Sequence, residues 1–347
     1  MRFDTGGSPH IHSSNHTAKI MLTVALAMLP GLLAQIWFFG FGVVLNISMA
    51  LAAGLAFEAI MLRLRMRPLR PFLSDNTTLV TAMLLGAALP PLAPWWIPVI
   101  GMFFAIVLAK QLYGGVGNNV FNPAMVGYVV LLTSFPFEMT QWLPSTSVAA
   151  GAPGIGESIN AFLTLPGVDA ITGASPLDVV KTELGQNLTL GEIVAAEPVI
   201  GLIGAPGWEW VNAAYLVGGV WLTLTRLVHW RIPVAMLIGL AAPALIANII
   251  DPDQFPGMGF HLFSGAAMLG AFFIATDPVT ASTTPKGALI FGAGIGFLVW
   301  LIRTAGGYPD GVAFAVLLMN MAAPLIDRYT TPPPFGATRP RTEDGEP

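Results

Sequence analysis

Residues 81–91 read TAMLLGAALPP, an apolar stretch that is rich in small residues and ends at Pro90 and Pro91. A similar segment, GAAMLGAFFIATDP, occupies residues 265–278, ends at a proline and is followed by another apolar segment. Interrupted helices at matching places in two halves of a chain are typical of transporter-like membrane proteins. The pair therefore predicts a bundle of two halves with a broken helix in each. The alternative is that small-residue membrane segments simply resemble one another.

The composition of the chain indicates a membrane protein. Of its 347 residues, 54% are hydrophobic and only 10% are charged, whereas a soluble globular protein carries about 25% charged residues. The net charge of −4 argues against nucleic acid as a partner. The absence of cysteine excludes disulfides, thiolate metal sites and cysteine-bound iron–sulfur clusters from this chain. No histidine or carboxylate cluster has convincing metal-binding spacing, so no metal site is expected.

Ten apolar segments are candidates for transmembrane helices, each of which needs roughly 20 apolar residues to span a bilayer. They cover residues 20–37, 41–62, 78–89, 96–109, 122–135, 210–227, 232–250, 262–277, 287–302 and 312–326. A long acidic loop separates the fifth segment from the sixth. The expected parts are an N-terminal transmembrane half at 1–136, the loop at 137–207, a C-terminal transmembrane half at 208–328 and a disordered tail at 329–347.

The distribution of charge predicts the orientation of the chain, because cytoplasmic segments of membrane proteins are rich in Lys and Arg. If both termini are cytoplasmic, the loop lies outside with seven carboxylates and one cation, Lys181. Arg303 is the exception, because a chain with ten transmembrane segments and cytoplasmic termini has this residue outside. The inner segments would hold most of the remaining basic residues: Arg63, Arg65, Arg67, Arg70, Lys110, Arg226, Arg231, Lys286, Arg328, Arg339 and Arg341.

Three polar stretches beside apolar segments are candidate binding sites. In residues 114–123, GGVGNNVFNP, glycines let a ligand approach the backbone, and Asn118, Asn119 and Asn122 offer donors and acceptors. The alternative is a loop whose Asn-Pro turn begins the next helix. Residues 74–78, SDNTT, are explained at least as well by a helix cap as by a site.

The third stretch, TDPVTASTTPK at residues 276–286, is rich in hydroxyl groups and carries one acid and one base. It could hydrogen-bond a polar ring or bind an ion. The alternative is a cytoplasmic turn with a helix cap. Its candidate binding residues are Thr280, Thr283, Thr284 and Lys286.

Two carboxylates are candidates for an ion path, because an acid within a transmembrane segment is expensive to bury and is often functional. Glu58 lies within the second apolar segment, and Asp277 lies at the end of the eighth. The alternative for Glu58 is a pairing with Arg63, about a turn and a half further along the same helix.

The loop contains the stretch DAITGASPL, residues 169–177. Read alone, it is a turn with two hydroxyl groups, Thr172 and Ser175, that become nucleophiles only if something activates them. The stretch resembles the flavin-attachment motif of the RnfD/NqrB family of membrane proteins. In that motif a maturation enzyme esterifies FMN, through its phosphate, onto the last hydroxyl residue.

Matched position by position, the resemblance places the acceptor at Ser175, with Asp169, Thr172, Gly173 and Ala174 in the same motif. The acceptor is serine where the family usually has threonine, and Ala170 stands where glycine is usual. Serine keeps the hydroxyl, so a phosphoester is still chemically possible. If the transferase refuses serine, Thr172 is the nearest alternative.

The resemblance covers nearly the whole chain. Besides the motif, the blocks that resemble RnfD proteins are residues 8–21, 74–91, 114–132 and 275–320. The resemblance implies an all-α polytopic membrane protein with ten transmembrane helices in two inverted five-helix repeats, similar to urea-transporter-like proteins, and a long periplasmic loop. The compact length favours the RnfD branch of the family over its NqrB counterpart.

The function that the resemblance implies is that of one component in a ferredoxin:NAD oxidoreductase, the Rnf complex of the bacterial inner membrane, which couples electron transfer to Na+ or H+ translocation. Covalent FMN would be one of the electron carriers of the complex. A noncovalent riboflavin is suggested as well, for which the stretches around Asn118 and Thr280 are the candidates. The implied partners are RnfA, RnfB, RnfC, RnfE and RnfG, a flavin transferase during maturation, and lipid.

Three other functions remain open from the sequence. One is an NqrB-like role in a quinone reductase. Another is a passive channel or transporter scaffold, which needs no flavin. The third is a structural anchor in the same complex whose flavin site has decayed through the change to serine. Esterification of Ser175 separates the electron carrier from the last two.

Overall fold

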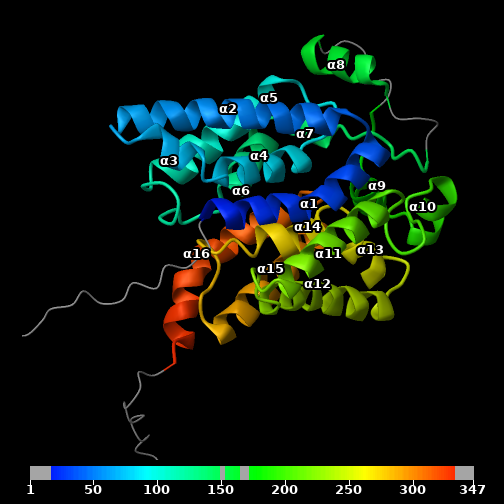
Figure 1. Ribbon diagram of the computed structural model, residues 1–347. Helices are drawn as coiled ribbons and strands as arrows, with labels where there is room; N and C mark the ends of the chain where they lie inside the picture. Colours follow the sequence, from blue (N-terminus) through cyan, green and yellow to red (C-terminus); the bar gives the residue numbers. More distant parts are fainter. Residues whose placement is uncertain (1–16, 149–152, 165–171, 333–347) are drawn as a thin grey trace, which may run out of the picture.

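The computed structural model describes residues 17–148, 153–164 and 172–332 and shows an all-helical protein (Figure 1). The first half contains the long helices α1 and α2, the short α3, the half-length α4, α5 with its π-helical continuation η1, and α6. Their bounds are α1 Thr17–Phe39, α2 Gly42–Leu64, α3 Leu69–Leu73, α4 Thr77–Ala88, α5 Trp96–Met102, η1 Phe103–Gln111 and α6 Pro123–Ser134.

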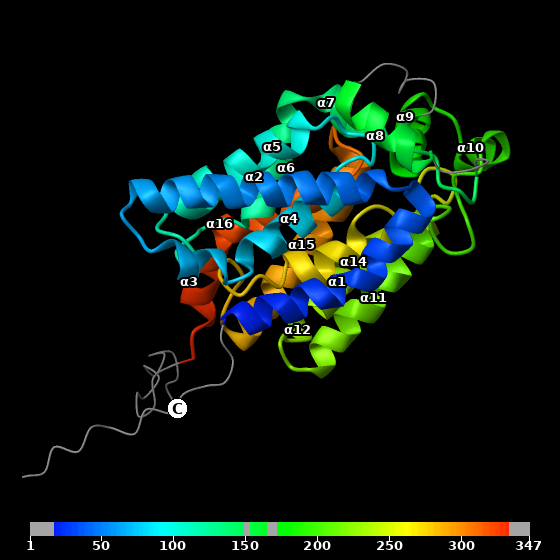
Figure 2. The ribbon, with the colours of Figure 1, turned by 45° about the horizontal axis from the view of Figure 1, so that its top comes forward.

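The second half also begins with two helices followed by a short one, and it too contains a π-helical segment, which here belongs to its third apolar segment and not to the fourth. Its members are α11 Trp208–Leu224, α12 Arg231–Ile250, α13 Met258–Leu262, α14 Ala267–Leu269, η3 Gly270–Ile274, α15 Pro285–Ala305 and α16 Val312–Thr330. Between the halves lie α7 Pro136–Thr140, α8 Ile155–Thr164, α9 Pro176–Gly185 and α10 Leu190–Ala196. Helices α8, α9 and α10 gather at one end of the bundle, which we call the loop end; the opposite end is the far end (Figures 1 and 2).

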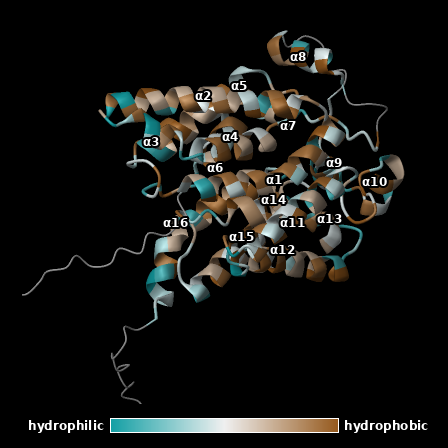
Figure 3. Ribbon diagram, in the orientation of Figure 1, coloured by the Kyte–Doolittle hydropathy of each residue, from teal (hydrophilic) through white to brown (hydrophobic). Residues whose placement is uncertain are grey.

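Each of the ten predicted apolar segments contains helix in the structure. Five helices, α1, α2, α12, α15 and α16, are long and apolar enough to cross a membrane, and α5–η1 and α6 are shorter apolar helices. Most residues of the bundle helices are hydrophobic, and hydrophilic residues gather at α3 and at the last turns of α16 (Figure 3). The chain is therefore a polytopic membrane protein.

The eighth predicted segment, residues 262–277, is interrupted by a non-helical turn before α14. Gly265 adopts φ +59°, a conformation that glycine reaches without strain. Asn212 of α11 donates from Nδ2 to the Gly265 carbonyl oxygen at 2.9 Å and accepts from the Met268 N–H at 3.0 Å. One buried amide thus satisfies backbone groups that the missing helical turn would have paired.

The two halves meet along α1 and α11, which lie side by side (Figure 2). A Cβ at Gly218 of α11 would collide with the Ala27 carbonyl oxygen of α1, so only glycine permits this approach. The contact also carries a buried hydrogen-bond chain: Gln35 donates to the Ala87 carbonyl at 2.9 Å and accepts from the Tyr215 hydroxyl at 2.9 Å. Gln35 therefore joins α1, α4 and α11.

We expect Tyr215→Phe to lower the free energy of unfolding by about 1 kcal/mol, because it removes one buried hydrogen bond and leaves the Gln35 oxygen without its donor. Thermal unfolding of the purified protein in detergent measures the change. Tyr329→Phe is the matched control, since Tyr329 is 80% exposed and its ring leaves the core unchanged. Equal melting temperatures for the two variants would contradict the role of this bond.

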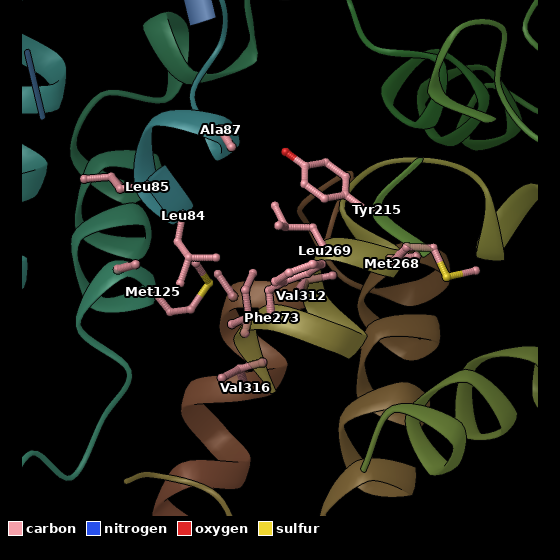
Figure 4. Packing of buried hydrophobic residues seen from close by; sticks show 14 of the residues in the cluster. Leu84, Leu85, Ala87, Met125, Tyr215, Met268, Leu269, Phe273, Val312 and Val316 are labelled. Atoms are coloured by element: carbon pink, nitrogen blue, oxygen red, sulfur yellow. The ribbon is translucent and has the colours of Figure 1, made fainter. Parts of the chain in front are cut away.

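Where the two halves face each other, an apolar layer fills the middle of the bundle. Figure 4 shows Leu84 of α4, Met125 of α6 and Phe273 of η3 converging there, with Leu269 and Val312 beside them. Side chains from the beginning of α4 line one cavity, and those from its end line another. The layer therefore separates a cavity at the loop end from a cavity at the far end.

Candidate functional site

The predicted flavin acceptor, Ser175, lies at the loop end as the N-cap of α9. Its hydroxyl oxygen accepts a hydrogen bond from the Asp178 N–H at 3.3 Å, and Pro176 occupies the first helical position. Serine as N-cap followed by proline is a strong helix-start signal, so the sequence itself places the hydroxyl at the helix N-terminus. Asp169, the first residue of the motif, is outside the described residues.

The residues just before Ser175 are docked on the segment that follows α7. Gly173 and Trp142 exchange two backbone hydrogen bonds, at 2.8 and 2.9 Å, and form an isolated antiparallel bridge. The Thr172 hydroxyl donates to the Gln141 side-chain oxygen. Gly173 and Ala174 themselves are exposed. Thr172 is thus engaged in holding the stretch, while Ser175 is presented beyond it.

A lysine in the middle of α9 anchors the helix to the rest of the bundle. Lys181 Nζ donates to the carbonyl oxygens of Ile302 at 2.9 Å, Tyr308 at 2.9 Å and Arg303 at 3.2 Å. These carbonyls lie at and just after the C-terminal end of α15, where a cation is favourable. Partial burial lowers the pKa of Lys181 and raises the pKa of Asp178, and each charge partly offsets the shift of the other.

We expect Lys181→Met to loosen α9 without removing the acceptor hydroxyl. Hydrogen bonds from a charged group contribute about 1.5 kcal/mol or more, so amide exchange in residues 176–185 should become roughly tenfold faster. Hydrogen–deuterium exchange with peptide mass spectrometry measures this. Lys286→Met, at an exposed position, is the control. Unchanged exchange in α9 would show that the lysine does not hold the helix.

Ser175 lines a cavity between the two halves, which we call the loop-end cavity. The space between its walls, counted out into the open mouth, is about 990 Å³. Its walls are mainly apolar and aromatic, and include Tyr128, Trp142, Trp208, Tyr215 and Leu269. The chemistry of these walls suits a planar aromatic ring.

Trp142 and Trp208 line this cavity and belong to an aromatic cluster that also contains Phe39. The rings of Phe39 and Trp208 have centroids 4.8 Å apart, and those of Trp142 and Trp208 are 4.9 Å apart. Trp142 belongs to the segment that docks the acceptor stretch, so the bridge to Gly173 also sets the position of this ring. Trp208 is the first residue of α11 and is only 7% exposed, so its ring packs in the interior.

Arg303, the exception in the charge distribution, is buried. Its guanidinium forms an ion pair with Asp310 at 3.1 Å and donates to the carbonyl oxygens of His261 at 2.6 Å and Ser264 at 3.1 Å. Asp310 also accepts from the Ala266 N–H at 2.9 Å. This arginine ties α15 to the interrupted segment on the wall of the cavity and adds no exposed positive charge to the loop end.

A second cavity, the far-end cavity, lies on the other side of the apolar layer. It measures about 870 Å³ including its opening. All three polar stretches singled out in the sequence contribute to it, through Thr77, Asn119, Asn122 and Asp277, and Lys110 also lines it. The fold therefore brings together residues that are up to 200 positions apart in the sequence.

The three asparagines of the first stretch differ in their placement. Asn122 caps α6, accepting from the Met125 N–H at 3.3 Å, and its own N–H donates to the Asn320 side chain at 3.2 Å. Asn119 donates to the Phe121 carbonyl at 3.1 Å and faces the cavity. Asn118 is exposed and does not line the cavity. The helix-cap interpretation thus holds for Asn122, which also faces the cavity.

The four candidate binding residues of the hydroxyl-rich stretch do not line the far-end cavity, in contrast to Asp277. Thr284 is the N-cap of α15, accepting from the Gly287 N–H at 3.0 Å. The Thr283 hydroxyl donates to Asp327 of α16 at 2.9 Å, and the Thr280 hydroxyl donates to Asp277 at 3.2 Å. Lys286 is exposed. The helix-cap alternative is therefore correct for Thr284.

Glu58 is paired with Lys110, not with Arg63. The Lys110 Nζ lies 2.6 Å from a Glu58 carboxylate oxygen, and both side chains are at most 3% exposed. Gln111 donates to the same carboxylate at 3.0 Å, and the Thr78 hydroxyl donates to its second oxygen. Arg63 is exposed at the end of α2. A lone lysine at the end of an apolar segment was the available signal for this partner.

Residues 4–336 of the chain match the NQR2, RnfD, RnfE family. The chain is 50% identical to the D subunit of the ion-translocating oxidoreductase complex of Aeromonas salmonicida over 349 residues, covering 97% of this chain and 99% of the relative. It is 49% identical to the protein of the same name from Cronobacter sakazakii and 48% identical to that from Escherichia fergusonii, with the same coverage.

Proposed function

The chain belongs to the NQR2, RnfD, RnfE family, and we propose that it is the RnfD component of an ion-translocating Rnf complex and carries FMN covalently on Ser175. Its curated relatives are D subunits of ion-translocating oxidoreductase complexes, and membership of such a complex makes it part of a membrane oxidoreductase. The observation that carries the flavin proposal is the position of Ser175, whose side chain lies at the start of α9 on the wall of the loop-end cavity.

The position of Ser175 suits a phosphoester. The N-terminus of a helix presents unpaired N–H groups and a partial positive charge, and both stabilise a phosphate. The N–H of Asp178 already points at the Ser175 oxygen. A phosphate esterified to this oxygen would keep those donors satisfied while the rest of the nucleotide extends into the cavity. Thr172, by contrast, is held by Gln141 and does not line the cavity.

The walls of the loop-end cavity suit the isoalloxazine ring. When bound, FMN supplies one- and two-electron chemistry. The chain's own part is to orient the ring between Trp142, Trp208 and the opposite wall, to exclude bulk water, and to hold the acceptor helix through Lys181. The aromatic cluster offers flat faces on which a planar ring can stack.

We propose the far-end cavity as the place of a second, noncovalent flavin. Its support is the joint presence of Asn119, Asn122 and Thr77, which offer hydrogen-bond donors and acceptors, on the walls of one cavity. The residues Thr280, Thr283, Thr284 and Lys286 act in local hydrogen bonds or are exposed, so they would hold such a flavin only indirectly. Of the two ion-path candidates, Asp277 faces this cavity, whereas Glu58 is closed within its ion pair.

We also propose that the two halves are inverted repeats, that both termini are cytoplasmic and that the loop end is periplasmic in the bacterial inner membrane. Both halves begin with two helices and a short helix, and this shared order supports the repeat. The basic residues at the inner ends of α2 and α11 and the acidic character of 137–207 support the orientation. The partners RnfA, RnfB, RnfC, RnfE and RnfG would supply the NAD and iron–sulfur sites, with Na+ or H+ as the coupled ion.

The experiment that tests the flavin proposal is intact and peptide mass spectrometry of the chain purified from cells that express its flavin transferase. The expected result is a mass increment of one esterified FMN, localised to the peptide that contains Ser175. An unmodified peptide from such cells would instead favour a passive scaffold or an anchor with a decayed site. Fragmentation that localises the increment to Thr172 and not to Ser175 would place the acceptor elsewhere in the motif.

A further inference from the structure

We infer that the hydroxyl of Tyr128 is a hydrogen-bond donor to the ring of the flavin held in the loop-end cavity, and that it raises the reduction potential of that flavin. This inference rests on the proposed function, since it concerns the same cavity. Tyr128 lies in α6, on the first half of the bundle, and lines the cavity together with Ser175.

The hydroxyl group of Tyr128 has no hydrogen-bond partner among the described residues of the protein. A buried tyrosine hydroxyl usually finds such a partner, and the cost of leaving one unpaired is high in an apolar setting. The hydroxyl is not fully enclosed by protein, and Tyr128 lines the loop-end cavity, so we assign the hydroxyl to that cavity.

The contrast with Tyr215 makes this observation informative. Tyr215 lines the same cavity from α11, on the opposite half, but its hydroxyl already donates a 2.9 Å hydrogen bond to Gln35. Asp310, another polar group on the wall, is held by Arg303 and by the Ala266 N–H. The polar groups of Tyr215 and Asp310 thus form hydrogen bonds within the protein. The Tyr128 hydroxyl remains available to a ligand in the cavity.

The chemistry of the flavin ring matches this donor. The ring carries carbonyl oxygens and unprotonated nitrogens that accept hydrogen bonds, and reduction makes these atoms more electron-rich. A neutral donor therefore stabilises the reduced ring more than the oxidised ring, and hydrogen bonds to the ring are one way in which a protein tunes the flavin. The remaining walls are mainly apolar, so a single donor has a large share of the polar contact.

The test is Tyr128→Phe, produced with the flavin transferase and compared with the wild type, Tyr215→Phe and Tyr329→Phe. Three quantities are measured on each: flavin attachment by peptide mass spectrometry, the midpoint potential of the attached flavin by spectroelectrochemistry, and the melting temperature. We expect Tyr128→Phe to keep the covalent flavin and the wild-type melting temperature, as Tyr329→Phe does, while its potential moves to more negative values and its flavin absorption bands shift.

Two results would overturn the inference while leaving the proposed function intact. One is a flavinylated Tyr128→Phe variant with the wild-type potential and absorption bands. The other is a melting temperature that falls as far as that of Tyr215→Phe, since this would reveal a structural partner for the hydroxyl. If the wild-type chain itself carries no flavin on the Ser175 peptide, the proposed function fails, and the role of Tyr128 fails with it.

Discussion

Replacing Ser175 with alanine is expected to abolish the covalently attached flavin. The hydroxyl oxygen is the only atom of this side chain that can form the phosphoester, and in the described part of the chain no neighbouring hydroxyl shares its position at the start of α9 and on the cavity wall. The measurement is in-gel flavin fluorescence after denaturation, followed by peptide mass spectrometry. Loss of the helix cap alone should lower the stability by only about 1 kcal/mol, so the variant remains foldable.

Two matched variants complete this experiment. Ser175→Thr restores the residue that is usual in the motif and should keep the flavin. Thr172→Ala removes the other hydroxyl of the stretch and its contact with Gln141, and most of the flavin signal should remain. A Ser175→Ala protein that stays fluorescent after denaturation would show that the acceptor is another residue.

Breaking the buried ion pair is expected to have the largest effect on stability. Lys110→Met leaves the Glu58 carboxylate, which is only 1% exposed, without its cation. Removing one partner of such a pair typically costs about 3–5 kcal/mol. Gln111 and Thr78 would still donate to the carboxylate, but they are neutral and do not compensate the charge. Unfolding in mixed micelles, monitored by circular dichroism, measures the loss.

A double-mutant cycle identifies the pair as the cause. The variant with both Glu58→Gln and Lys110→Met has no buried charge at this site, so it should be more stable than Lys110→Met alone. Arg63→Ala is the control for the alternative pairing and should change the stability by less than about 0.5 kcal/mol. A larger loss with Arg63→Ala than with Lys110→Met would show that Arg63, and not Lys110, supplies the counter-charge.

The positions of the helices could be predicted well from the sequence because apolarity and length dominate the behaviour of membrane segments. The interruption before α14 falls inside residues 262–277, which the sequence predicted as one segment ending at Pro278, so its position and its cause were both missed. Asn212, which satisfies the Gly265 and Met268 backbone, is one asparagine in an apolar helix some 50 residues away. Arg303 did not fit the orientation predicted from the charges. The structure explains this, because the residue is buried and paired with Asp310, and neither its burial nor its pairing can be read from the sequence.

The candidate sites were predictable only in part. The acceptor stretch was found through resemblance, and the loop-end cavity beneath it was not, because its walls come from helices spread over the whole chain. In the hydroxyl-rich stretch, local pattern could not separate binding from capping. Thr283 and Thr280 are occupied by Asp327 and Asp277, whereas Asp277 itself, a single acid, reaches a cavity.

The buried ion pair has a consequence for the synthesis of the protein. Glu58 and Lys110 are 52 positions apart (110 − 58), so at about 5–20 residues per second the ribosome reaches the lysine roughly 3–10 s after the glutamate. During that interval α2 must enter the bilayer with an acid that has no counter-ion, which the insertion machinery penalises. The 23 residues of α2, with no other charge before Arg63, provide the apolar length that lets it insert alone. Once η1 has been inserted, the ion pair between Glu58 and Lys110 holds η1 against α2.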